Sequence, residues 1–165
     1  MNGSRLFPPG QEYEGPKPPF YFLILIAIAS SSRSLIHIFH ADGGASVIAG
    51  LNVNVEGGTN LIATFGQWGA SQLILSLIYW LVILRYRALT PLMLAVVVLE
   101  QLLRLGVGQI KPLEVTAAPP GAIGSGLLLP VAVLALVWSL WMNPKPDENS
   151  QPMAATAKKK KQKRN

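Results

Sequence analysis

Hydrophobic residues gather into four segments of the chain, separated by shorter polar stretches. The segments cover residues 20–39, 60–84, 89–108 and 123–142. Each is long enough to cross the hydrocarbon core of a bilayer, which takes roughly 17–25 helical residues. The pattern predicts an all-α fold, a four-helix transmembrane bundle over 20–142.

Basic residues near the segment ends predict the orientation of this bundle. They lie before the first segment, between the second and third at Arg85 and Arg87, and after the fourth. Lys111 is the only lysine or arginine in the two loops 41–59 and 109–122. Because loops rich in lysine and arginine stay in the cytoplasm, we expect both termini on that side and the two longer loops on the other.

Polar residues inside the segments fall at a similar depth in three of the predicted helices. Arg33 and His37 are four residues apart, as are Glu100 and Arg104, so each pair shares one helix face. Charged groups within a membrane span turn to the protein interior and pair there. We therefore predict a polar pocket or ion network in the outer half of the bundle, with Glu100 between the two arginines. Its predicted members are Arg33, His37, Gln67, Glu100, Gln101 and Arg104.

Three interpretations of these polar residues stay open at the level of the sequence. A buried ion network fixes helix register or a partner interface. A polar pocket binds a ligand, such as a lipid head group, a quinone or a sterol-like substrate. In the third interpretation, Arg33 and Arg104 extend to the outer interface without contacting Glu100. A collapsed network would favour the structural role, whereas an open, partly apolar pocket would favour a ligand.

The composition agrees with a membrane protein, since 50% of the residues are hydrophobic and only 13% are charged. The net charge of +6 comes mostly from the polar tail 143–165, so the body of the protein is not a basic nucleic-acid platform. We expect this tail and the N-terminal segment 1–19 to be cytoplasmic, the tail to be disordered, and its basic residues to bind anionic lipid. These residues are Lys158, Lys159, Lys160, Lys161, Lys163 and Arg164.

The sequence gives little support for metal or catalytic chemistry. His37, His40 and Asp42 are close in sequence, but no second ligand cluster accompanies them and Arg33 would repel a cation. The chain contains no cysteine, no phosphate-binding loop and no zinc-protease or hydrolase motif. We therefore predict no metal site, leave the catalytic residues of an enzymatic alternative unassigned, and favour a non-enzymatic role.

The run FGQWGASQLILSLIYW (65–80), followed by a helix that contains Glu100, resembles the superfamily of DoxX and DoxD-like membrane proteins. The similarity extends over about 20–142 and includes the length, the four spans, the long first loop and the glycine-containing start of the second helix. It implies a small four-helix membrane protein. Members of this superfamily include subunits associated with quinone-linked oxidoreductases, and a related branch contains sterol-pathway proteins.

The sequence therefore predicts a small multi-pass protein, most simply of the plasma (cytoplasmic) membrane. We expect a subunit or scaffold of a membrane complex, with a membrane-protein partner. The alternative is a membrane-embedded ligand-binding protein or enzyme that holds a quinone or a lipid or sterol-like substrate in the polar pocket. Quinone is the one cofactor considered, and only in that alternative.

Overall fold

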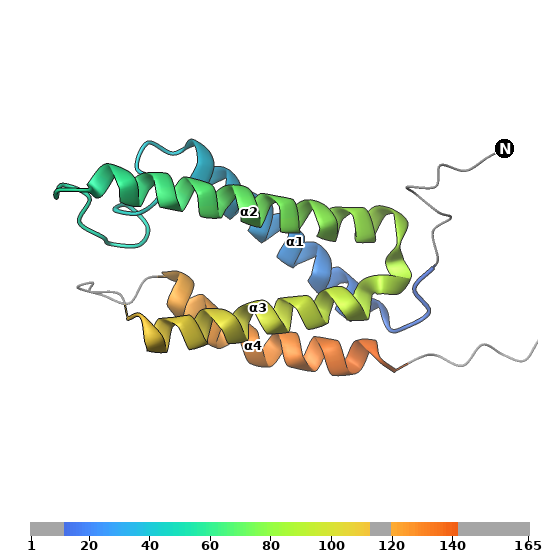
Figure 1. Cartoon of the computed structure of the whole chain (residues 1–165). Coiled ribbons are helices and arrows are strands. Elements are labelled where there is room, and N and C mark those ends of the chain that lie inside the picture. Colours follow the sequence, from blue (N-terminus) through green and yellow to red (C-terminus); the bar gives the residue numbers. More distant parts are fainter. Residues whose placement is uncertain (1–11, 113–119, 142–165) are drawn as a thin grey trace, which may run out of the picture.

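The computed structural model of the protein describes residues 12–112 and 120–141, apart from the side chains of Pro120 and Ala122. Within these ranges every regular element is a helix and there is no strand, which confirms the predicted all-α class (Figure 1). The predicted disordered tail, with its basic residues, lies outside the described residues. The helices are α1 (Lys17–Phe39), α2 (Gly58–Arg85), the short 3-10 helix η1 (Arg87–Leu89), α3 (Thr90–Ile110) and α4 (Pro120–Ser139).

Three of the helices, α1, α2 and α3, are long and apolar enough to cross a bilayer. α1 begins three residues before the predicted span because Pro18 and Pro19 occupy its first turn, where the N–H that proline lacks would have no helical partner. The fourth predicted span, 123–142, overlaps α4, which begins and ends three residues earlier. Its apolar helix, Ile123–Ser139, extends about 26 Å at 1.5 Å per residue, slightly less than a hydrocarbon core of about 30 Å.

The helices form two pairs, because α1 packs mainly against α2 and α3 mainly against α4. α1 crosses the structure diagonally, so its first half lies near α3 and α4 and its second half lies along α2 (Figure 1). The first half of α1, the last part of α2, the first half of α3 and the second half of α4 share one hydrophobic core. Its members include Leu23, Ala27, Tyr79, Val82, Leu94, Val97 and Ala132.

This core lies at the end of the structure where α1 begins and α4 ends (Figure 1). The turn between α2 and α3, with Arg85 and Arg87, lies at the same end. The opposite end carries the connection between α1 and α2. There the two helix pairs separate, and contacts other than a shared apolar core must join them.

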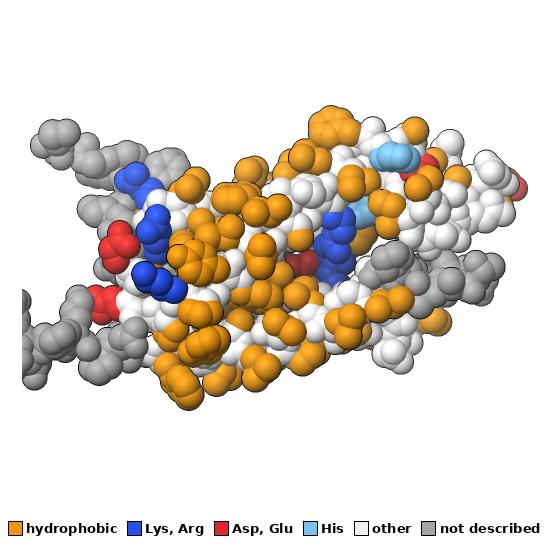
Figure 2. All heavy atoms as spheres, turned by 180° about the vertical axis from the view of Figure 1, so that it is seen from behind, with side chains coloured by type: hydrophobic (Ala, Val, Ile, Leu, Met, Phe, Trp, Pro, Cys, Tyr) orange, Lys and Arg blue, Asp and Glu red, His pale blue; other side chains and the backbone are white. Residues whose placement is uncertain are grey.

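The outward surfaces of the helices are strongly apolar. Figure 2 shows hydrophobic side chains across the middle of one face, with most charged side chains at one end. Large residues such as Leu25, Ile74, Leu84 and Leu134 are more than 60% exposed. Since exposed apolar patches of this extent are rare on soluble monomers, the surface suits lipid.

α1 and α2 approach each other closely at Gly69. A Cβ atom added to Gly69 would lie 2.6 Å from the Cβ of His37 and 3.1 Å from the carbonyl oxygen of Ser34. One turn earlier, a Cβ atom on Gly66 would meet only the carbonyl oxygen of His37, at 3.7 Å. The close packing of α1 against α2 therefore requires glycine at position 69 but not at position 66.

We predict that Gly69→Ala destabilises the protein by about 1–3 kcal/mol, because the methyl group forces α1 away from α2. Gly66→Ala is the matched control: it gains the same helix propensity, up to about 1 kcal/mol, without the clash. Thermal unfolding of both variants in detergent, followed by circular dichroism, measures the difference. Equal effects of the two substitutions would contradict the close packing.

Candidate functional site

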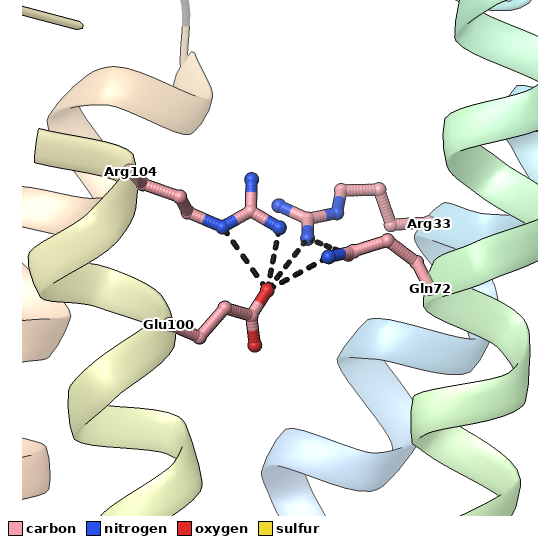
Figure 3. A network of polar contacts seen from close by, with 4 residues as sticks. All are labelled: Arg33, Gln72, Glu100 and Arg104. Atoms are coloured by element: carbon pink, nitrogen blue, oxygen red, sulfur yellow. Dashed lines mark hydrogen bonds and ion pairs between the residues drawn. The ribbon is translucent and has the colours of Figure 1, made fainter. Parts of the chain in front are cut away.

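Four polar side chains from three helices meet at the end where the helix pairs separate (Figure 3). They are Arg33 of α1, Gln72 of α2, and Glu100 and Arg104 of α3. Arg104 lies one turn after Glu100 and donates two hydrogen bonds to its Oε1 atom, from Nε at 3.0 Å and Nη2 at 2.5 Å. The i, i+4 spacing in α3 therefore produces the ion pair that the sequence predicts.

Gln72 connects this ion pair to the other helix pair. Its Nε2 atom donates to Oε1 of Glu100 at 2.8 Å, and its own oxygen accepts a hydrogen bond from Nη2 of Arg33. Nη2 of Arg33 also lies 3.9 Å from Oε1 of Glu100. An amide can take part on both sides because it carries a donor and an acceptor. A single carboxylate oxygen thus joins α1, α2 and α3 (Figure 3).

The indole of Trp68 forms one wall of the cluster. The guanidinium carbon of Arg104 lies 5.0 Å from its ring centroid and that of Arg33 lies 5.4 Å from it. The ring of His37 is 4.8 Å away. Guanidinium groups at this range are attracted to the negative face of an aromatic ring, so Trp68 helps to hold both arginines without neutralising their charge.

The cluster is only partly shielded, and its charges do not balance. The side chains of Arg33, Glu100 and Arg104 retain 33%, 16% and 19% of their exposure. Two guanidiniums therefore surround one carboxylate. Glu100 thus compensates the charge of one arginine and leaves one positive charge in excess within the described cluster.

The connection after α1 folds against the cluster. His37 is buried, and its Nδ1–H donates to the carbonyl of Gly43 at 2.7 Å. Gly43 and Gly44 have φ angles of +60° and +74°, which favour glycine and allow the chain to turn back here. A Cβ atom on Gly44 would also lie 3.5 Å from the His37 ring. His37 therefore fixes the position of this loop beside Arg33 and Arg104.

Asp42 organises the same loop. Its carboxylate accepts hydrogen bonds from the backbone N–H groups of Val47 at 2.8 Å, Gly44 at 2.7 Å and Ser46 at 2.9 Å. It also accepts one from Nδ1 of His40 at 2.6 Å. The pKa of the Asp42 carboxyl lies well below its usual range, because these hydrogen bonds stabilise its charged form. The bond from the Val47 N–H contributes most, followed by those from Gly44, His40 and Ser46. His40 is thus engaged by the loop, away from Glu100.

An open cleft of about 710 Å³ adjoins the cluster. Figure 2 shows a recess in which an acidic side chain lies beside basic ones, between apolar side chains. The recess lies on the long side of the structure, between the two helix pairs. The polar residues Arg33, His37, Gln72, Glu100 and Arg104 line it together with apolar ones that include Ile48, Phe65, Trp68, Leu103 and Leu105.

The structure brings together four of the six residues that the sequence places in the polar pocket: Arg33, His37, Glu100 and Arg104. Gln67 instead faces outward and is exposed, and Gln101 is buried on another face of α3. Neither lines the cleft. The reason is helical phase, because a neighbour in sequence points about 100° away.

Sequence reasoning missed Gln72 and Trp68 as members of the cluster. Both lie in α2 and are four residues apart, so they share one face. The sequence signal was available in this spacing, since Gln72 is a polar residue inside an apolar helix, one turn from an aromatic residue that two arginines can contact.

Arg33 and Arg104 do not extend separately to the interface, because both contact Glu100. Within 12–112 and 120–141 there is no group of three histidine, cysteine, aspartate or glutamate residues that could hold a metal ion.

Comparisons of the chain with family models, curated proteins and solved structures find no match. Function is therefore inferred from the geometry of the cleft and from the charges that line it.

We predict that Glu100→Gln lowers the free energy of unfolding by about 1–3 kcal/mol, because both arginines lose their shared acceptor. The double variant Glu100→Gln/Arg104→Gln recovers part of this loss, since it removes one of the uncompensated cations. Denaturant titration in micelles measures both values. Glu56→Gln, the same change at an exposed loop position, is the control and changes the free energy of unfolding by less than about 0.5 kcal/mol.

A second prediction concerns the loop. The lowered pKa of Asp42 means that its stabilisation is complete above the ordinary aspartate pKa of about 4 and fades as the pH falls toward the folded-state value. Asp42→Asn therefore speeds amide hydrogen exchange in 44–47 at neutral pH, and the difference from the parent protein shrinks in acid. Asn52→Ala is the control, because it removes a neutral acceptor of a loop N–H and has an effect independent of pH.

Proposed function

We propose that the protein spans a membrane with all four helices and with both termini in the cytoplasm. The long apolar helices and the exposed leucine and isoleucine side chains support the proposal that the protein spans a membrane. The cytoplasmic position of the termini is supported by Arg85 and Arg87, which lie at the end where α1 begins and α4 ends (Figure 1). In this orientation, the cleft lies toward the outer surface.

We propose that the cleft binds an amphipathic ligand of the membrane. The observation that carries this function is the open space beside the charged cluster, about 710 Å³, in the range of pockets that hold small molecules. A purely structural ion network would close upon itself and exclude such a space. Apolar walls suit a hydrocarbon chain or ring system, and convergent guanidiniums suit an oxygen-bearing head group.

The cleft also opens in a direction that suits such a ligand. It lies on the long side of the structure, between α1 and α2 on one side and α3 and α4 on the other. If the helices cross the bilayer, this side faces lipid. A lipid, quinone or sterol-like molecule then enters from the membrane without passing through water. No covalent step is part of this function, and Arg33 and Arg104 act as binding residues.

The second candidate is a subunit or scaffold of a membrane complex, with a membrane-protein partner. It is supported by the way in which Gln72 and two arginines converge on one oxygen of Glu100. Such a network fixes the relative register of three helices, as a structural component requires. In this case the partner, and not a small molecule, covers the cleft.

The test is to fill the cleft and look for a lost ligand. Leu103 lines the cleft, whereas its neighbour Leu102 does not, and both are at least half exposed. We predict that the tagged protein, purified in mild detergent, carries a small molecule that native mass spectrometry detects. Leu103→Trp reduces its occupancy about tenfold, as a loss of about 1.4 kcal/mol would, and Leu102→Trp leaves it unchanged.

A ligand retained in Leu103→Trp would place the binding site elsewhere. A purified protein with no bound molecule but with a stoichiometric protein partner, lost in Glu100→Gln, would favour the subunit function instead.

A further inference from the structure

The cleft has a net positive character that the described side chains do not cancel. Three basic residues line it, Arg33, Arg104 and Lys111, and one acidic residue, Glu100. Glu100 contacts both arginines through the same oxygen. Its single negative charge is therefore shared, and one guanidinium is left without a counter-charge among the residues that the structure describes.

The free-energy cost of this excess charge is higher in lipid than it would be in water. Arg33 and Arg104 each lie six residues before the end of their helix, about 9 Å below it at 1.5 Å per residue. At that depth little water is present to solvate an excess cation. Mobile salt ions also screen a recessed charge less than an exposed one. An occupant that brings a negative charge is thus favoured over a neutral one.

Arg33 also has hydrogen-bonding capacity that the described residues leave unused. Its Nη2 atom donates to Gln72, but its Nε atom is buried and has no hydrogen-bond partner in the described part of the chain. Arginine presents its N–H groups as a planar fork, which matches phosphate and carboxylate oxygens. An anionic group beside Arg33 would supply the missing acceptor after a small rotation of the side chain.

The basic residues are arranged along a path from the mouth of the cleft to its interior. Lys111 directly follows α3 and is exposed, and Gln109 also lines the cleft at this level. Arg104 lies about two turns deeper in the same helix, opposite Arg33. A head group that enters from the outer surface would meet one cation at the mouth and two below it, while its chains remain in the lateral opening.

We propose that the occupant is an anionic phospholipid, whose phosphodiester lies between Arg33 and Arg104 and whose acyl chains extend along the apolar walls into the bilayer. This inference rests on the proposed function, because it names the ligand of the same cleft. The phosphodiester of an anionic phospholipid such as phosphatidylglycerol gives a net charge of −1, which balances the excess guanidinium, whereas the choline of zwitterionic phosphatidylcholine cancels the phosphate charge. A neutral quinone or sterol would leave the guanidinium charge unbalanced.

The test compares two lipids that differ in charge and share their chains. The full-length protein is placed in nanodiscs of phosphatidylcholine with 20% phosphatidylglycerol, then released for native mass spectrometry. The ratio of bound phosphatidylglycerol to bound phosphatidylcholine is expected to be about tenfold higher than the same ratio in the nanodisc. Arg33→Gln and Arg104→Gln remove this enrichment. Arg87→Gln, which deletes the same charge at the opposite end of the structure, leaves it intact.

Two further variants keep the test informative if the arginine variants fold poorly. Arg33→Lys retains the charge and most of the enrichment. Glu100→Gln makes the cleft more positive, and it increases the enrichment of phosphatidylglycerol although it weakens the network. A fall in enrichment with Glu100→Gln in folded protein would overturn the charge-balancing role of the lipid.

The two experiments separate a failure of the anionic-lipid proposal from a failure of ligand binding in the cleft. A quinone or another neutral molecule that Leu103→Trp displaces, with no preference for phosphatidylglycerol, would overturn the anionic lipid and preserve the ligand-binding cleft. A free fatty acid bound in place of phospholipid would overturn the phosphodiester in the same way. Absence of any bound amphiphile from the parent protein would overturn both.

Discussion

The need to compensate the charge of a carboxylate between long apolar helices governs the arrangement of this protein. Glu100 is the eleventh of the 21 residues of α3 and therefore lies near the middle of this largely apolar helix. Its Oε1 atom accepts hydrogen bonds from Arg104 and Gln72 and pairs with Arg33. Because a lone carboxylate is so costly there, these contacts fix which faces of α1, α2 and α3 meet.

The two ends of the structure are held by different forces. At one end the four helices share an apolar core around Leu23, Tyr79 and Leu94, which is nondirectional and closes the space between them. At the other end the contacts through Glu100 are directional and few, so the helix pairs stand apart and a cleft remains. The same network that joins the pairs therefore presents two guanidiniums to whatever occupies that space.

Much of the helical architecture was predictable, because long apolar runs specify helices at membrane length. The meeting of Arg33, Glu100 and Arg104 also followed from their depth and spacing. Helical phase relative to neighbours did not follow, which is why Gln67 was predicted in place of Gln72. The cleft was not predictable either, since its size depends on how far α1 diverges from α3. The fourth helix begins and ends three residues before the predicted span, at Pro120 and Ser139, because hydropathy alone does not mark helix ends.

In the proposed arrangement, Glu100 holds the two helix pairs together across an open cleft. The chain contains no cysteine, so paired spin labels measure this directly. Labels at the exposed positions Ser71 and Leu102 report the distance between α2 and α3 near the cleft, and labels at Leu81 and Leu92 report it near the core. With Glu100→Gln in lipid nanodiscs, we expect a longer mean distance and a broader distribution at the cleft, and an unchanged distribution at the core. Identical distributions at the cleft with and without the carboxylate would contradict this arrangement.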